Sequence, residues 1–342
     1  MATYKEIFGT NIEVLASDPA NPVTGQVWYN STDNVVKGAA ATTAGAWATA
    51  TSINTTRGNV ATSVQSPVSS VLAYGGSNPG GVVEGETEQY NGTTWTELAD
   101  LNTARGVSSG GGTNTAALCT GGYLGPPGST GVVESWNGSS WAEVADLNTA
   151  RYASGGGVGS NTANLIAGGL STPPTIVHAQ VEQWNGTSWT EVGDLNSSRY
   201  ASGAAGESYT SAIIAAGGNP GFTGIANVET WNGTSWTEIA DVNTARTGLE
   251  SGGTQTSTII FGGSVPGTPD PVKTGATEIW NGTSWTEDTD LNTARDGAAP
   301  GGGVTATSSA IAIAGTTDAG TLAAVEEWTG AGSPLIYTFT DS

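Results

Sequence analysis

The chain has 342 residues, of which 52 are glycine and 11% are charged, and its formal net charge is −21. Frequent glycine penalises helix interiors and no heptad pattern is present, so a coiled coil is excluded and an all-β chain is expected. With few Lys and Arg, we expect no nucleic-acid or anionic-membrane partner. One Cys and one His exclude a disulfide framework and a Cys/His zinc site. We therefore predict no cofactor and no metal.

Residues 1–44 lie outside the repeated part of the chain and predict an anchoring arm. Residues 25–38, GQVWYNSTDNVVKG, predict a β-hairpin because strand formers flank the turn formers STDN. So short a segment exposes backbone donors and acceptors that must be paired somewhere. We therefore expect residues 1–44 to be extended and to contact other chains.

The same hairpin segment carries a resemblance. GQVWYNSTDNVVK resembles N-terminal segments of tailed-phage virion proteins, especially fibre and adhesin subunits, in which such a stretch precedes a variable distal part. The resemblance implies a virion component that binds other virion proteins through residues 1–44 and is a homo-oligomer in the particle. No signal-peptide pattern or long apolar run is present, so we expect assembly in the host cytoplasm without membrane insertion.

Near copies of one stretch organise the rest of the chain. VESWNGSSWAEVADLNTAR, at residues 133–151, recurs with small changes at four other places, and a partial copy ends at residue 57. Successive copies are 46 to 49 residues apart, a period typical of stacked or radial repeats. The arginines that close the copies are Arg57, Arg105, Arg151, Arg199, Arg246 and Arg295.

Each repeat unit predicts four short β-strands. After the arginine come a Gly-rich run, an apolar run closed by paired glycines, a loop, a VEQW-type strand, an NGTS turn and a SWTEVADL-type strand. The Asn-Gly pair of NGTS is expected to form a tight hairpin turn, because both residues tolerate positive φ. Eleven of the 12 tryptophans lie at repeat positions, Trp28 being the exception.

Short strands at this period, with paired glycines and with tryptophans on the third and fourth strands, indicate a β-propeller. The paired glycines and the absence of a WD dipeptide make the repeat resemble kelch rather than WD40. The third-strand aromatic, mostly Trp, and the weak pair Gly315 and Thr316 depart from the usual kelch pattern. We predict a six-bladed kelch-like propeller at 45–329, an arm at 1–44, and a tail or extra strand at 330–342.

The last unit lacks a fourth strand, and the opposite end of the chain offers one. Trp47 stands ten residues before Arg57, the same spacing as Trp95 to Arg105. We therefore expect the strand that contains Trp47 to pair with the VEEW strand that ends at Trp328. This pairing would close the ring and remove an open edge.

Residues 335–340, LIYTFT, compete for the same place because they also have strand character. The tryptophan spacing favours the N-terminal strand. We therefore expect residues 335–340 to form an extra outer strand or a contact with a neighbouring subunit.

The six arginines could form a ring of anion-binding groups or could anchor one blade to the next. Each unit also has a Glu two residues before the third-strand aromatic and, in most units, an Asp five residues before the arginine. Repeated basic groups beside repeated carboxylates are typical of structural ion-pair networks, so we predict a structural role. The carboxylates are Glu88, Glu134, Glu182, Glu229, Glu278, Glu326, Asp100, Asp146, Asp194, Asp241 and Asp290.

No catalytic residue is predicted. The copper site of a galactose oxidase needs two histidines, whereas this chain has only His178. The active site of a sialidase needs an arginine triad that breaks the repeat symmetry, whereas the six arginines here follow it. No nucleophile-elbow or Walker motif is present. We expect a protein that is not an enzyme.

The loops between the second and third strands are the only part of the unit whose length and sequence vary between copies. They hold nine of the 14 prolines, which limit loop entropy. Rigid, divergent loops on one face of a scaffold are typical of a recognition surface. The candidate ligand-binding residues are Tyr123, Tyr152, Tyr200 and Phe222, aromatic residues of the kind that stacks on sugar rings.

The sequence therefore predicts a phage fibre or adhesin subunit that presents its propeller to a host-surface glycan. The alternative is a purely structural head-decoration, tail or collar protein without receptor binding, whose loops pack on neighbouring subunits.

Overall fold

The computed structural model describes residues 12–19, 25–41, 44–126, 128–265, 272–332 and 334–339. Within these ranges the regular elements are β-strands, apart from one 3-10 helix, η2 (Gly303–Thr305). The all-β fold class is thus confirmed. The chain forms two compact units: Met1–Gly45 with Gly330–Ser342, and Ala46–Thr329.

The described residues of the larger unit form six four-stranded sheets, named sheets 1 to 6 in chain order. Sheet 1 contains β5 (Ala61–Thr62), β6 (Leu72–Tyr74), β7 (Thr87–Tyr90) and β8 (Trp95–Glu97). Sheet 2 contains β9 (Ser109–Thr113), β10 (Ala116–Tyr123), β11 (Ser129–Trp136) and β12 (Trp141–Glu143). Sheet 3 contains β13 (Gly155–Gly159), β14 (Asn164–Ala167), β17 (Val181–Trp184) and β18 (Trp189–Glu191).

In each of these sheets neighbouring strands are antiparallel, and the second half of the unit has the same arrangement. Sheet 4 contains β19 (Gly203–Ser208), β20 (Ser211–Ala215), β21 (Val228–Trp231) and β22 (Trp236–Ile239). Sheet 5 contains β23 (Glu250–Thr254), β24 (Ser257–Phe261), β27 (Thr277–Trp280) and β28 (Trp285–Asp288). Sheet 6 contains β29 (Ala299–Gly301), β30 (Ser309–Ile313), β33 (Val325–Thr329) and β4 (Ala46–Ala50).

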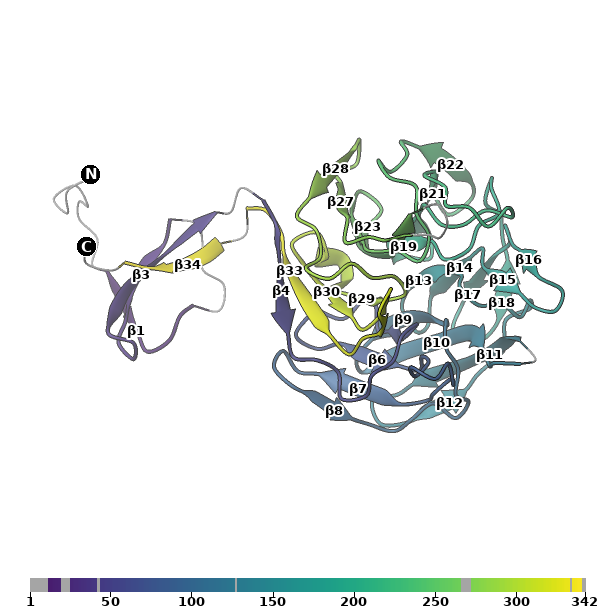
Figure 1. The fold of residues 1–342 in the computed structure, drawn as a ribbon, viewed down its shortest axis with the longest axis horizontal. Helices are drawn as coiled ribbons and strands as arrows, with labels where there is room; N and C mark the ends of the chain where they lie inside the picture. The colour runs from purple at the N-terminus through teal and green to yellow at the C-terminus, as the bar shows by residue number, and fades with distance from the viewer. Residues whose placement is uncertain are drawn as a thin grey trace. The chain divides into compact units, whose positions relative to one another are not determined.

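The first strand of each sheet faces the centre of the unit (Figure 1). Each of these inner strands contacts the inner strands of both neighbouring sheets, and β29 contacts β5. Their glycines permit this approach: a Cβ added at Gly110 would overlap the Thr62 carbonyl oxygen, and one at Gly157 would overlap that of Gly110. A side chain at either glycine would therefore force the inner strands apart.

Tryptophans fill the space between sheets farther from the centre. Trp136 and Trp141 pack with ring centroids 5.4 Å apart, and Trp184 and Trp189 with centroids 5.3 Å apart. The fourth-strand indole also reaches the preceding sheet, as when Trp141 Nε1 donates to Thr87 Oγ1 at 3.0 Å. Each sheet is thus packed and hydrogen-bonded to its neighbour.

The N-terminal strand β4 supplies the fourth strand of sheet 6. It pairs antiparallel with β33, and Trp47 stands opposite Trp328, which is the pairing expected from the spacing. The Trp47 ring lies 5.3 Å from that of Trp328, and its Nε1 donates to Thr277 Oγ1 at 3.0 Å. Trp47 therefore has the contacts that Trp141 has in sheet 2.

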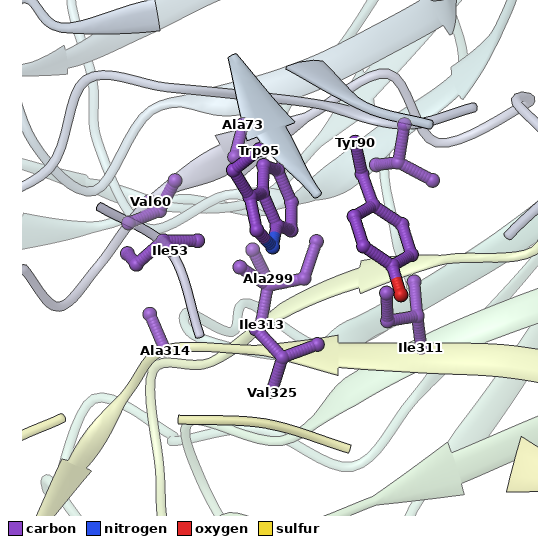
Figure 2. Close-up of a cluster of buried hydrophobic side chains, with 11 residues drawn as sticks. Ile53, Val60, Ala73, Tyr90, Trp95, Ala299, Ile311, Ile313, Ala314 and Val325 are labelled. Atoms are coloured by element: carbon purple, nitrogen blue, oxygen red, sulfur yellow. The ribbon is translucent and has the colours of Figure 1, made fainter. Parts of the chain in front are cut away.

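Sheets 6 and 1 share a hydrophobic core (Figure 2). Tyr90 and Trp95 of sheet 1 stack with centroids 4.9 Å apart. Branched side chains of β30 and β33 pack against the same cluster. The core across the junction of the first and last sheets consists of Ile53, Val60, Val71, Ala73, Tyr90, Trp95, Ala299, Ile311, Ile313, Ala314 and Val325.

A cycle of six backbone hydrogen bonds also joins the sheets. The residue two positions after each repeat arginine donates its N–H to the carbonyl of its equivalent in the preceding sheet, at 2.7 to 3.0 Å. The sixth bond runs from Asn59 to Gly297 and completes the cycle. All members have left-handed φ values of 47° to 63°. The members of this axial cycle are Asn59, Val107, Ala153, Ala201, Gly248 and Gly297.

The NGTS turns differ from the expected tight hairpins. In the turn after β7, φ is positive at Gly92 but not at Asn91. The Asn91 side-chain oxygen instead accepts the backbone N–H groups of Thr93 and Thr94, both at 2.9 Å. The prediction for Asn was wrong because its role is to cap a four-residue turn with its side chain.

The glycine pair of sheet 4 is shifted by one residue from the predicted position. In sheets 1, 2, 3 and 5 the second glycine donates to the carbonyl of the next arginine, as Gly76 does to Arg105 at 3.0 Å. In sheet 4 this donor is Gly217, to Arg246 at 2.9 Å. The pair is therefore Ala216 and Gly217, with φ values of 57° and 102°. The weak pair Gly315 and Thr316 of sheet 6 is shifted as well, to Ala314 and Gly315, with φ values of 61° and 101°.

The smaller unit contains a four-stranded sheet in the order β1 (Glu13–Leu15), β2 (Val27–Asn30), β3 (Val35–Ala41) and β34 (Pro334–Thr338). Strands β2 and β3 form the predicted hairpin. Trp28 is fully buried, and its Nε1 donates to Asp18 Oδ1 at 3.1 Å.

The pairing of β34 corrects the predictions for both ends of the chain. Residues 335–338 of the LIYTFT segment pair antiparallel with β3, not with a sheet of the larger unit. Described residues of the arm are folded into this sheet rather than extended, because β34 pairs the edge of β3 that the hairpin alone leaves open. The tail and the arm thus share one unit. Residues 1–11, 20–24, 42–43 and 340 lie outside the described residues.

Candidate binding face and axial cavity

All six repeat arginines are buried, and each pairs with the third-strand glutamate of the sheet that it precedes. Arg105 Nη1 lies 2.6 Å from Glu134 Oε1, and the exposed fraction of both side chains is zero. The same carboxylate accepts the N–H of Asn102, the Asn102 side-chain amide and the N–H of Thr103, at 2.8 to 3.1 Å. We call this arrangement of Asn, Thr, Arg and Glu the carboxylate latch.

The latch connects consecutive sheets. Asn102 lies in the connection that follows β8 of sheet 1, whereas Glu134 lies on β11 of sheet 2. At the end of the ring, Asn292 donates to Glu326 Oε2 at 2.8 Å and to the Trp47 carbonyl at 3.1 Å. The pairs are Arg57–Glu88, Arg105–Glu134, Arg151–Glu182, Arg199–Glu229, Arg246–Glu278 and Arg295–Glu326.

The aspartates expected in the same network lie elsewhere. Asp100 is exposed, and its Oδ1 accepts the Thr87 N–H at 3.3 Å. Asp290 has the equivalent bond to Thr277 at 3.3 Å. In the described ranges, no ion pair joins a repeat arginine to one of these aspartates. The prediction that these aspartates belong to the ion-pair network was wrong, because the loop turns their side chains toward solvent.

The four predicted binding aromatics form two pairs. Tyr123 and Tyr152 have ring centroids 5.3 Å apart, and Tyr200 and Phe222 have centroids 5.7 Å apart. Phe222 is 58% exposed, whereas the three tyrosines are partly buried. Tyr152 and Tyr200 each follow a repeat arginine directly and make equivalent bridges, to Leu170 and Gly218, so they occupy equivalent positions in consecutive repeats. The aromatics of sheets 2, 3 and 4 therefore lie on one face.

An open cavity of about 400 Å³ lies beside the first pair and is named here the tyrosine groove. Its walls come from the end of β10 and the loop after it, from the loop that follows β14, and from Val107 and Tyr152 in the connections that lead to β9 and β13. The two loops are tied together. Ser129 N–H and Oγ donate to the Thr172 carbonyl at 3.3 and 3.2 Å, and Thr172 N–H donates to Ser129 Oγ at 3.1 Å. The groove is lined by Val107, Tyr123, Pro126, Gly128, Tyr152, Thr172 and Pro173.

Sequence reasoning found the two tyrosines of the groove but missed its other residues. Val107 is a member of the axial cycle, so its place in the repeat identifies its location near the axis. Thr172 follows the short strand β15 (Leu170–Ser171), which pairs with β16 (Ile176–Val177) inside a variable loop. No repeated pattern marks that ribbon.

The described cations are all engaged in ion pairs. The six arginines bind glutamates, Lys37 lies 2.8 Å from Asp18, and Lys273 pairs with Asp296. Lys5 lies outside the described residues. None of the described residues that line the tyrosine groove is charged. A ligand there meets aromatic rings, prolines and hydroxyl groups rather than a counter-charge.

An axial cavity of about 120 Å³ lies among the inner strands. All members of the axial cycle line it, and Glu250, the first residue of β23, is its one ionisable lining residue among those described. Burial, with a smaller effect of Asp296, raises the pKa of the Glu250 carboxyl well above 4.5. Gln65 Nε2 of sheet 1 donates to the Glu207 carbonyl of sheet 4 at 3.3 Å, a bond that joins sheets three positions apart.

Other reactive side chains are engaged in the core. His178 Nδ1 lies 2.7 Å from Gln180 Oε1, and its Nε2 lies 2.9 Å from Ser171 Oγ. Cys119 is buried. Across the part of the chain that the structure describes, no three His, Cys, Asp or Glu side chains gather as metal ligands would. The described helix content likewise offers no membrane-crossing candidate.

The carboxylate latch predicts unequal effects for two glutamates that stand directly opposite each other on β11 and β12, the buried Glu134 and the exposed Glu143. Glu134→Ala leaves the Arg105 guanidinium buried without its carboxylate, so we expect a loss of roughly 3–5 kcal/mol in unfolding free energy. Glu143→Ala should cost less than about 0.5 kcal/mol. Urea unfolding of both variants checks this, and equal losses would contradict the latch.

Glu250 predicts a pH-dependent change in stability. Its folded-state pKa is raised, so the stability linked to its protonated form is fully present below about pH 4.5 and is lost as pH rises through the folded pKa. Glu250→Gln should therefore melt near the wild-type temperature at pH 4 and increasingly above it toward pH 8. A difference in melting temperature that does not change with pH would show that the carboxyl does not titrate in this way.

The comparisons with known proteins support the fold but indicate no function. No protein family matches the chain, and no curated protein matches it. The solved structure of YjhT matches with a TM-score of 0.69 and 12% identity, covering 84% of this chain and 99% of that chain. At this identity the likeness shows the fold alone, and 411 chains of solved structures match, so no function follows from it. The chain has a β-propeller fold, as the sequence predicts.

Proposed function

We propose that this protein is a non-enzymatic virion structural protein of a tailed phage, a fibre or adhesin subunit that presents its propeller to a host-surface glycan. The observation that carries the proposal is the tyrosine groove, where Tyr123 and Tyr152 lie between two loops that are tied together. Aromatic rings in a rigid groove provide flat apolar surface with polar edges. Such a surface fits the apolar face of a sugar ring.

The finer architecture that we infer is a closed, six-bladed, kelch-like propeller. In this interpretation sheets 1 to 6 are the blades, and the β4–β33 pair closes the ring. The axial cycle supports six blades because its sixth bond returns to the first member. Closure gives the binding loops a rigid base, since the ring then has no open sheet edge.

A non-enzymatic role is supported by the contacts of the arginine and histidine side chains, the groups that catalysis would use. The repeat arginines are buried against glutamates, so their guanidinium groups do not face a ligand. Both ring nitrogens of His178 have partners. In this proposal the glycan is therefore bound by the aromatic side chains of the tyrosine groove.

The smaller unit supplies the proposed attachment to the particle. Four of its side chains are apolar and exposed, with exposed fractions of 39% to 65%. Exposed apolar residues on a small sheet favour contact with another chain, either a second copy or another virion protein. The side chains are Val14, Ile336, Tyr337 and Phe339.

The same apolar surface also favours the second candidate, a head-decoration, tail or collar protein that binds no receptor. In that case the smaller unit would carry the whole function, and the variable loops would pack on neighbouring subunits.

A glycan array separates the two candidates. The labelled full-length chain is applied to immobilised bacterial surface oligosaccharides, with Glu143→Ala as a control for surface substitution and heat-unfolded chain as a control for adhesion. We expect binding to a restricted set of glycans that the unfolded chain does not bind. Absence of binding to any glycan, with incorporation of the chain into particles, would reject the adhesin role and favour the structural candidate.

A further inference from the structure

The chemistry of the tyrosine groove restricts its ligand. Its described lining consists of two tyrosine rings, two prolines, a valine, a threonine and a glycine. The tyrosine rings provide stacking surface, and their hydroxyl groups can donate and accept hydrogen bonds. The groove thus offers an apolar surface with neutral polar groups at its edge.

The charge of the surroundings restricts the ligand further. A site for an anionic sugar needs an arginine or lysine to pair with the carboxylate or phosphate. The described cations already have carboxylate partners, and the six arginines are buried. The chain also has a net charge of −21, which repels anions at long range. An acidic sugar would be desolvated in the groove without compensation.

The size of the groove restricts the length of the ligand. Its volume of about 400 Å³ lies at the lower end of the range of roughly 300–1,000 Å³ for small-molecule sites. The tied loops around Ser129 and Thr172 bound it. A short glycan end fits this space better than the middle of a long chain.

We propose that the tyrosine groove binds the terminal, uncharged pyranose of a glycan, with its apolar face stacked on Tyr152 and Tyr123. This inference rests on the proposed function and names the substrate class of that site. The second pair, Tyr200 and Phe222, does not line the groove. The proposed site therefore does not include these two of the four aromatics predicted from the sequence. The pair serves as a matched control of similar chemistry on the adjacent sheet.

Saturation-transfer NMR on the full-length chain tests the proposal. The probes are the neutral methyl α-D-glucopyranoside, methyl α-D-mannopyranoside and methyl β-D-galactopyranoside, with the anionic methyl β-D-glucuronide as the charge control. We expect transfer to the ring C–H protons of at least one neutral glycoside. We also expect the glucuronide to bind at least tenfold more weakly than that glycoside.

Variants locate the binding. Tyr152→Ala should lower affinity for the neutral glycoside by about tenfold, because it removes one stacking face. Phe222→Ala should leave the affinity within about twofold. Tyr123→Ala provides a second groove variant if Tyr152→Ala does not fold, and melting curves establish which variants are folded.

Three outcomes would overturn the proposal: no transfer to any neutral glycoside, equal binding of the glucuronide, or no effect of both tyrosine variants. Each is distinguishable from failure of the proposed function. If the glycan array shows binding to acidic glycans, or binding that survives both groove variants, the adhesin role stands and the neutral-pyranose site is rejected. If the array shows no glycan binding at all, the adhesin role itself is rejected.

Discussion

The buried third-strand carboxylate is the interaction on which the propeller depends. A glutamate without exposed surface needs several donors, because burying an unpaired charge is costly. Glu134 obtains them from Asn102, Thr103 and Arg105, all contributed by the chain as it leaves the preceding sheet. The latch therefore fixes the path of the NTAR segment and the position from which the next inner strand starts. Its sixfold repetition explains why these residues recur at a nearly constant spacing.

The arginine fixed by the latch leads directly into the axial cycle, where four of the six members are not glycine. A left-handed conformation costs roughly 1–2 kcal/mol for such a residue, and at Val107 and Ala153 the cycle holds it in place through a hydrogen bond of 3.0 Å. Inner strands that start there pack too closely for large side chains. Glu250, the first residue of the inner strand β23, has a large side chain, and this side chain lines the axial cavity.

Most of the propeller could be predicted from the sequence because its contacts repeat. Five near copies define the strand order, and the distance from Trp47 to Arg57 identifies the strand that completes sheet 6. The pairing of β34 with β3 could not be predicted in this way, since it occurs once and no other unit provides a template. The error at Asn91 has a different origin, because Asn suits both a left-handed residue and a side-chain cap.

The candidate site was predictable only in part. Tyr123 could be named because it begins a variable loop, and Tyr152 because it follows a repeat arginine at a position where the residue differs between units. Their pairing across sheets 2 and 3 needed the three-dimensional arrangement. Thr172 and Pro173 could not be assigned to the same groove, since loop conformation outside the repeat has no periodic signal.

The molecule combines repeated sheets, which share their contacts, with a loop face that does not repeat. We propose that the latches and the axial cycle make these sheets one cooperative ring, including the junction between the first and last sheets. Native-state hydrogen exchange of the six axial-cycle amides tests this most directly. We expect all six to exchange slowly, with the free energy of global unfolding. The Asn59 N–H donates to Gly297 and the Gly297 N–H donates to Gly248, so these two amides report on the junctions of the last sheet with its neighbours. Faster exchange at Asn59 and Gly297, with protection of Ala153 and Ala201, would show that the ring opens there and would contradict this cooperative structure.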